Sequence, residues 1–314
     1  MLLLHFLAFV AAAAVLAGSS VLLVGAITKI ALKLKVSEFL VGFILVAVGT
    51  NIPDFLVSVV AATRGEPLLS LGTVIGANIV YLTLIIGIPA LIAHGIRLRS
   101  QVRNREIVYT NLFAIAPLIL LLDGTLSRND GILLLLLFAF NLYNLILRSS
   151  SYTRVIRDQD ENISLLKELL LFGGELVALL ASTEIVIHTG VALATALGIP
   201  TILIGIFAFA LGVALPDLSF GISAATRRCG EMLIADILGS VVTNSTLVLG
   251  TVTLFRPITI GRSDVLSTSV AVLLISLFAF TLFARSQYRI SIKEGLFLVL
   301  GYLLFAVSTL LFEV

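Results

Sequence analysis

Long apolar segments, separated by short polar ones, follow one another along the whole chain. Each is close to or above the roughly 20 residues that a helix needs to cross the hydrocarbon core of a bilayer. The first runs from Leu2 to about Ile27 with no basic region before it, too long for a cleaved signal peptide, so we expect it to stay as a membrane span. The pattern predicts ten spans, over residues 4–28, 38–63, 70–93, 106–122, 131–148, 166–189, 200–226, 232–255, 265–284 and 293–313.

The longest polar break divides these spans into two equal groups. It covers residues 149–165 and is rich in serine and charged residues. We therefore expect a first five-helix unit over 1–148, a linker over 149–165, and a second five-helix unit over 166–314.

The basic residues predict the orientation of the spans. With ten spans, sixteen of the 20 lysines and arginines fall in loops on one side. The other side receives only Arg64, Arg128, Arg256 and Arg262. Cytoplasmic loops are enriched in basic residues, so the linker is expected in the cytoplasm and both termini outside the cell membrane.

Composition narrows the class of protein. Apolar residues make up 59% of the chain and charged residues 12%, against about 45–50% and 25% in soluble domains. A soluble enzyme and a disordered protein are thereby excluded. The single cysteine, Cys229, excludes an intramolecular disulfide and a cysteine-built metal site. The expected partners are the lipid bilayer and inorganic cations, with no nucleic acid and no cofactor.

The two halves repeat one sequence pattern. A shift of 163 residues places Pro53-Asp54 on Pro216-Asp217, and the segment 61–64 on 224–227. Five is an odd number of spans, so the second half enters the membrane from the opposite side. Inverted repeats of this kind are typical of secondary transporters, whose binding sites lie near the bilayer midplane between broken helices.

The repeated Pro-Asp pair is the strongest candidate for chemistry. Proline cannot donate a helical hydrogen bond, so Pro53 and Pro216 are expected to free the carbonyls of Gly49 and Gly212. Freed carbonyls at that depth are tolerated where they line a cavity. Together with Asp54 and Asp217 they would form an all-oxygen site suited to a hard cation such as Ca²⁺. The alternative is a structural role, with the aspartates hydrogen-bonded or protonated; the symmetric pair favours function.

The eighth span supplies further polar groups on one face. Asp236, Ser240 and Asn244 are spaced four residues apart. Ser240 and Asn244 are predicted as cation ligands, although both could instead hold helices together. For Asp236, a solvated carboxylate near the helix end and an acid on the ion pathway both remain open. In the sixth span, Glu184 and His188 are expected to pair locally.

These motifs resemble those of the calcium/cation antiporter superfamily, and most closely those of the prokaryotic sodium/calcium exchangers. Residues 49–54 and 72–78 fit the two motifs of the first alpha-repeat, and residues 212–217 and 236–240 fit those of the second. The resemblance implies an electrochemically driven exchanger with both motif acids as Ca²⁺ ligands. It also implies that the carbonyls of Ala47 and Ala210 contribute to sodium sites.

The sequence departs from the family pattern at several ligand positions. Both motif glutamates are aspartates here, and Val213 and Ala214 stand where the family has hydroxyl residues. The first repeat keeps oxygens at Thr50 and Asn51, but has Ala77 and Tyr81 in place of Ser and Asn. These changes remove oxygens that would complete sodium coordination. Na⁺ is the favoured counter-ion, with H⁺ carried by the same two aspartates as the alternative.

Two functions of other classes fit the sequence less well. An intramembrane aspartyl protease expects a Gly-Asp motif, and the chain contains no Gly-Asp dipeptide. A passive cation channel is less natural for a single inverted repeat with helix breaks at matching positions. The sequence therefore predicts an all-α membrane antiporter, not an enzyme, that exchanges Ca²⁺ for a monovalent cation.

Overall fold

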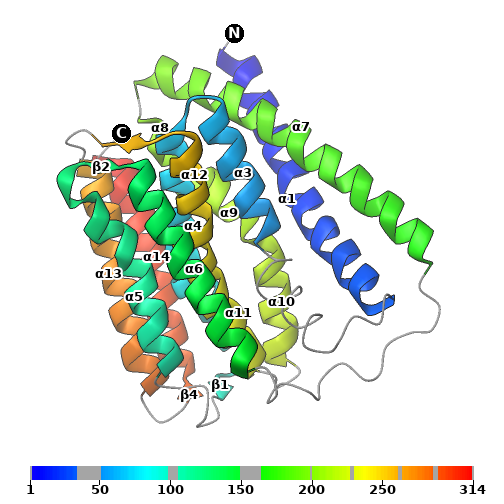
Figure 1. Ribbon diagram of the computed structural model, residues 1–314, viewed down its shortest axis with the longest axis vertical. Helices are drawn as coiled ribbons and strands as arrows, with labels where there is room; N and C mark the ends of the chain where they lie inside the picture. The colour runs from blue at the N-terminus through cyan, green and yellow to red at the C-terminus, as the bar shows by residue number, and fades with distance from the viewer. Residues whose placement is uncertain are drawn as a thin grey trace.

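The computed structural model describes residues 2–33, 51–97, 105–148, 164–198, 200–226, 230–260, 264–285 and 289–312. Almost all of them are helical (Figure 1). The longer helices are α1 (Leu2–Lys33), α3 (Ile52–Thr63), α4 (Pro67–Ile92), α5 (Arg105–Leu120), α6 (Arg128–Arg148), α7 (Leu165–Leu197), α10 (Leu215–Thr226), α11 (Gly230–Thr243), α12 (Leu249–Phe255), α13 (Asp264–Arg285) and α14 (Ile292–Phe312).

Shorter elements complete or connect these helices. The seventh predicted span is assembled from α8 (Thr201–Leu203), the π-helical η4 (Ile204–Phe209), α9 (Ala210–Val213) and α10. The π-helical η5 (Asn244–Val248) joins α11 to α12, and the 3₁₀ turn η2 (Leu121–Asp123) follows α5. In the described parts of the loops there are four two-residue strands: β1 (Ile96–Arg97), β2 (Thr125–Leu126), β3 (Ile258–Thr259) and β4 (Arg289–Ile290).

The helices agree with the predicted membrane architecture, although the number of spans is not confirmed. Among the described residues, seven helices are long and apolar enough to cross a bilayer, or eight with the bent α8–α10 segment as one span. Of the predicted span 38–63, only α3 is described, because residues 34–50 lie outside the described ranges. The ends marked N and C lie at the same end of the molecule, as an even number of spans requires (Figure 1). Ten spans remains a prediction.

The bend in the seventh span lies where the Pro-Asp motif predicted a break. The axes on either side of Ala214 differ by 42°. Pro216 has no N–H to donate to the carbonyl of Gly212, and its ring crowds that carbonyl. The sequence thus places the start of a new helix, α10, in the middle of a membrane span.

The loop strands reveal the inverted symmetry directly. β1 pairs with β4 and β2 pairs with β3, each antiparallel. The buried pair Ile96–Ile290 in the first sheet corresponds to the buried pair Ile258–Leu126 in the second. β2 and β4 lie at opposite ends of the molecule in Figure 1. Each sheet therefore joins one strand from each half, and the two sheets occupy opposite ends of the bundle.

The last helix of each half begins with the same local structure. At the start of α6, Ser127 and Asp130 form a reciprocal cap, with the backbone N–H of Ser127 donating to Asp130 at 2.8 Å. At the start of α14, Ser291 and Glu294 repeat this arrangement, with a corresponding distance of 2.6 Å. Such capping boxes satisfy backbone donors that a helix start leaves free. The offset here is 164 residues, one more than in the Pro-Asp motif.

Glycines bring these last helices into backbone contact with the other half. A Cβ on Gly131 of α6 would lie 2.8 Å from the carbonyl oxygen of Gly250 in α12. A Cβ on Gly295 of α14 would lie 3.1 Å from the carbonyl oxygen of Gly87 in α4. Gly87 and Gly250 are themselves 163 residues apart, so the two close contacts are symmetry equivalents. Small residues allow such close approach of helices in a bilayer.

α4 is the central helix of the molecule. Most of its residues are buried, and its cluster of apolar side chains continues into α11–α14. On its other side, Gly72 and Gly76 lie against the backbone of α8 and η4, with the carbonyls of Ile202 and Ile206 occupying the space of a side chain. Gly205 of η4 lies equally close to the backbone of α4. These backbone contacts fix the position of α4 relative to α8 and η4.

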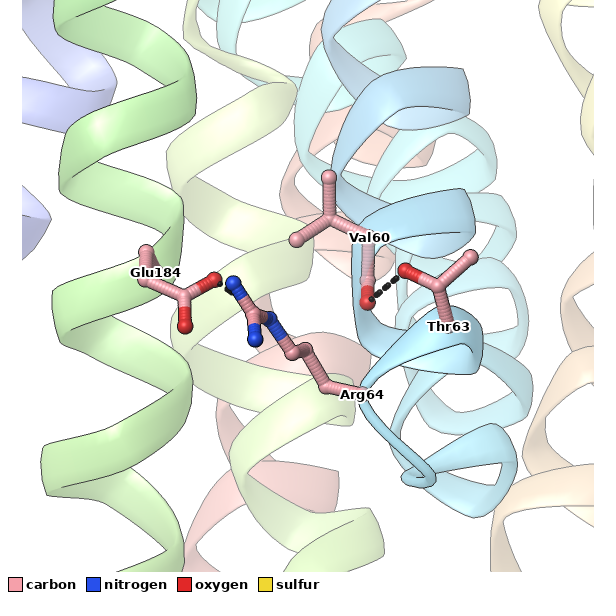
Figure 2. A network of polar contacts seen from close by, with 4 residues as sticks. All are labelled: Val60, Thr63, Arg64 and Glu184. Carbon is pink, nitrogen blue, oxygen red and sulfur yellow. Dashed lines mark hydrogen bonds and ion pairs between the residues drawn. The ribbon is translucent and has the colours of Figure 1, made fainter.

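α1 and α7 form a separate pair beside this bundle. They lie side by side along their lengths and cross obliquely next to the other helices (Figure 1). Lys29 of α1 and Glu168 of α7 form an ion pair with an N–O distance of 3.3 Å. Figure 2 shows a second ion pair, in which Arg64 after α3 donates to Glu184 of α7 at 2.9 Å. The sequence suggested a local partner for Glu184, His188; this contact instead reaches another helix.

The packing of α4 leads to a stability prediction. Gly76→Ala should lower the free energy of unfolding by about 1–3 kcal/mol, because backbone atoms of Ile206 cannot move away as a flexible side chain could. Gly173→Ala in α7 is the matched control, since nothing lies within 4 Å of a Cβ at that position. Thermal unfolding of the purified variants measures the difference. Equal melting temperatures for both would contradict the described packing.

Candidate cation site

Each motif aspartate lies in the first turn of a helix that begins inside the protein. Asp54 is in the first turn of α3 and Asp217 in the first turn of α10. The two helices start alike: the N–H of Phe55 donates to the carbonyl of Asn51 at 3.0 Å, and that of Leu218 to Ala214 at 3.0 Å. Helix N-termini carry partial positive charge, which stabilises a nearby carboxylate. Both side chains are inaccessible to water, with exposed fractions of 1% and 0%.

The hydroxyl of Tyr81 connects the two acids. It donates to Oδ2 of Asp54 at 2.8 Å and lies 3.2 Å from Oδ2 of Asp217. Tyr81 is a residue of α4 and is completely buried. One hydroxyl oxygen therefore lies between carboxylates from the two halves of the chain.

Asn244 provides a second donor to Asp54. Its Nδ2 donates to Oδ2 of Asp54 at 2.8 Å. Asn244 begins the π-helical segment η5, and single π turns within α-helices are frequently found at functional sites. Tyr81 and Asn244 are separated by 163 residues, so these two donors occupy equivalent positions of the repeat.

Asn51 and Ser240 join the two halves at the same level. Nδ2 of Asn51 donates to Oγ of Ser240 at 3.2 Å, and both side chains are buried. A nearby bond of the same kind runs from Nδ2 of Asn78 to Oγ of Ser245 at 2.9 Å. The contact of Ser240 is the one expected of a residue that holds helices together; its role as a ligand stays a prediction.

The site contains buried acceptor oxygens that fit a cation. Among the described residues, Oδ1 of Asp54 and Oδ1 of Asn244 have no hydrogen-bond partner. Unpaired buried acceptors cost free energy unless water or an ion satisfies them. The described residues contain no cluster of three or more acidic, histidine or cysteine side chains arranged for a metal. A cation here would depend on two carboxylates and neutral oxygens, which suits a hard ion.

Four of the other residues singled out in the sequence can be placed. Ala210, at the start of α9, has a carbonyl that accepts from the N–H of Ala214 at 3.2 Å. Val213 and Ala214 are buried next to the helix break and offer no side-chain oxygen. Asp236 is completely buried in α11, which excludes the first of its two open alternatives, a solvated carboxylate. The predicted ligands Ala47 and Thr50 lie outside the described residues.

The place of Tyr81 in the site was not predicted from the sequence. The residue was interpreted as the loss of an oxygen ligand, because a tyrosine stands where the family has an asparagine. Its hydroxyl instead lies at the centre of the site, in contact with both acids. The available signal was the repeat itself, which pairs position 81 with the predicted ligand Asn244.

Comparison with known proteins agrees with this architecture. The model of the family described as "Sodium/calcium exchanger protein" matches residues 4–147 and 167–311. The inner membrane protein YrbG of Escherichia coli is 30% identical over 243 residues, which cover 74% of each chain. The sodium/calcium exchanger MaX1 of Methanosarcina acetivorans is 25% identical over 323 aligned positions, covering 89% of this chain and 91% of the relative.

A solved structure of the sodium-calcium exchanger NCX_Mj, soaked with Na⁺ and Sr²⁺, is similar along nearly the whole chain. The TM-score is 0.67 with 27% identity, and the match covers 98% of this chain and 99% of the other. The chain belongs to the sodium/calcium exchanger family. It is an integral, multi-pass membrane protein built from inverted helical repeats, and two of the proteins that it resembles, MaX1 and NCX_Mj, are named as exchangers.

The Asn51–Ser240 contact gives a second stability prediction. Ser240→Ala removes the acceptor of a buried bond between the halves, and should lower the free energy of unfolding by about 0.5–1.5 kcal/mol. Ser269→Ala is the control, because that buried hydroxyl donates only within its own helix, to Val265 at 2.7 Å. Thermal unfolding without added divalent cations is the measurement. Equal melting temperatures for the two variants would show that the Asn51–Ser240 bond does not contribute to stability.

Proposed function

We propose that this protein is a secondary antiporter that exchanges Ca²⁺ for a monovalent cation, with Na⁺ favoured. Asp54 and Asp217 together hold the divalent ion. The observation that supports this most directly is the meeting of two completely buried carboxylates, one from each half, at a single hydroxyl. Its membership of the sodium/calcium exchanger family supports the same function.

Electrostatics favours a divalent cargo. Two ionised carboxylates shielded from water carry a large desolvation penalty, and their like charges repel each other. One Ca²⁺ neutralises both charges, and its preferred ligands are carboxylate and carbonyl oxygens. Oδ1 of Asp54, which has no partner among the described residues, is the first oxygen available to it.

The monovalent ion would use neutral oxygens of the same site. We assign to it the carbonyls of Ala47 and Ala210 and the side chains of Thr50 and Asn51. Ser240 and Asn244 complete the shared site from the second half. Because Na⁺ and Ca²⁺ then compete for one set of oxygens, binding of one displaces the other, and this competition couples their opposite movements.

Transport follows alternating access between the two halves. We assign residues 1–148 and 166–314 to the two repeats and 149–165 to a linker in the cytoplasm. The excess of basic residues on that side of the membrane supports this orientation, which leaves both termini outside.

An alternative is Ca²⁺/H⁺ antiport by the same two aspartates. The buried positions Val213 and Ala214, next to the helix break of the second half, favour it because they provide no hydroxyl for Na⁺. In that cycle the aspartates carry protons on the return step.

Neutralising either aspartate should abolish exchange. Asp54→Asn and Asp217→Asn each remove one of two charges that hold the divalent ion, while keeping the size of the side chain and one of its two acceptor oxygens. Uptake of ⁴⁵Ca²⁺ into proteoliposomes under an imposed sodium or proton gradient is the measurement. Glu175→Gln, a neutralisation on α7, which contributes no residue to the proposed site, is the control and should leave uptake unchanged. Full exchange by either aspartate variant would exclude the proposed ligands.

The counter-ion is tested by restoring the missing oxygens. Val213→Thr with Ala214→Ser adds one hydroxyl at each of two buried positions beside the break, and should make the dependence of Ca²⁺ flux on sodium stronger and steeper. Flux is measured against sodium concentration at two pH values for wild type and double variant. In a proton-driven cycle the rate would fall as the pH is lowered, with little response to sodium. A steep sodium dependence in wild type that the double variant leaves unchanged would disprove our interpretation of these two positions.

A further inference from the structure

The Tyr81 hydroxyl contacts a carboxylate oxygen of each of the two acids. It contacts Oδ2 of Asp54, on α3, and Oδ2 of Asp217, on α10, from a third helix, α4. A phenol is rigid beyond its two side-chain torsions, so its oxygen is placed by the position of α4. The distance between the two carboxylates is therefore linked to the position of α4, a different helix from the two that carry the aspartates.

The helix that carries Tyr81 is held firmly. The residues of α4 from Leu69 to Thr83 are all buried, and its backbone touches that of α8 and η4 at Gly72 and Gly76. The tyrosine ring lies within the main apolar cluster of the protein and has no exposed surface. Close-packed interiors of this kind resist small displacements. The hydroxyl cannot follow the carboxylates if they are pushed apart.

The hydrogen bonds of Asp54 leave room for a cation without displacing Tyr81. Tyr81 and Asn244 both donate to Oδ2, whereas Oδ1 has no partner among the described residues. A cation can therefore bind Oδ1 while the hydroxyl stays on Oδ2. Groups that hold a ligating side chain in this manner commonly change metal affinity by about 10–100-fold.

We propose that Tyr81 is the positioning residue that sets cation selectivity, by tying Asp54 to Asp217 and limiting how far the two carboxylates can separate. A cation larger than Ca²⁺ needs longer distances to its oxygens and so must stretch or break one of the two hydroxyl contacts. Wild-type protein accordingly favours Ca²⁺ over Sr²⁺ and, more strongly, over Ba²⁺. This inference rests on the proposed function, because it assumes that both aspartates bind the divalent cargo.

Tyr81→Phe tests the inference, because it removes the hydroxyl and keeps the ring. The assay is binding of ⁴⁵Ca²⁺ to purified protein, in competition with Mg²⁺, Sr²⁺ and Ba²⁺. We expect the variant to bind Ca²⁺ about tenfold more weakly or worse, and its preference for Ca²⁺ over Ba²⁺ to fall several-fold. Asn244→Ala removes a proposed ligand oxygen and a donor to Asp54, so it should also weaken binding, but it leaves the Tyr81 contacts that limit the separation of the carboxylates and should therefore keep the preference for Ca²⁺ over Ba²⁺.

The matched control is Tyr302→Phe, which removes another buried tyrosine hydroxyl, one without a hydrogen-bond partner among the described residues. It should bind like wild type. An unchanged ratio of Ca²⁺ to Ba²⁺ affinity in a folded Tyr81→Phe protein would overturn the inference, as would tighter binding of every cation. If the variant does not fold, the wild-type protein still tests the inference. Equal wild-type affinity for Ca²⁺ and Ba²⁺ would refute a limit on the separation of the two carboxylates. Absence of any divalent binding or exchange by wild type refutes the proposed function instead.

Discussion

Two carboxylates that water cannot reach must each find hydrogen-bond donors and positive potential inside the protein, and the architecture of the centre follows from that requirement. A continuous helix offers neither, because its N–H groups are already used along its length. Starting a new helix at each aspartate supplies both at once. The prolines next to Asp54 and Asp217 produce those starts, and the 42° bend at Ala214 shows the effect in the second half.

The inverted repeat brings the two helix starts together, and small residues make the meeting close enough. Gly131 and Gly295 bring α6 and α14 against α12 and α4 at equivalent places, while Gly72, Gly76 and Gly205 seat α4 against η4. The symmetry of the backbone is not matched by the side chains. Position 81 carries a phenol and its equivalent, position 244, a shorter amide. The hydroxyl of Tyr81 contacts both acids, whereas the amide of Asn244 donates to Asp54. The fold is therefore symmetric, but the site is not.

Much of this could be predicted from the sequence, and what was missed has physical causes. Asp54 and Asp217 stood out because a Pro-Asp pair inside an apolar span has few structural explanations, and Pro216 also located the bend. The place of Tyr81 in the site was not predicted because a comparison of residue types counts lost groups and cannot show how far a new side chain reaches. The burial of Asp236 and the Arg64–Glu184 contact depend on which helices become neighbours, which periodicity does not encode. The matched capping boxes at Ser127 and Ser291 escaped notice because one extra residue changes the offset to 164.

The contacts at the centre also indicate where a conformational cycle would act. A ligand shifts an equilibrium only through interactions that differ between two states. The bond from Asn244 to Asp54 joins η5 to α3, and the bond from Tyr81 to Asp217 joins α4 to α10, so movement of α3 or α10 against these neighbours must lengthen or exchange them. The glycine contacts of α4 make that helix a poor candidate for the moving part. α1 and α7, which pack mainly on each other and contact the other helices mainly through α3, α8, α9 and α10, are less constrained. α3 carries Asp54 and α10 carries Asp217. Movement of α1 and α7 would therefore be transmitted to the cation site through these two helices.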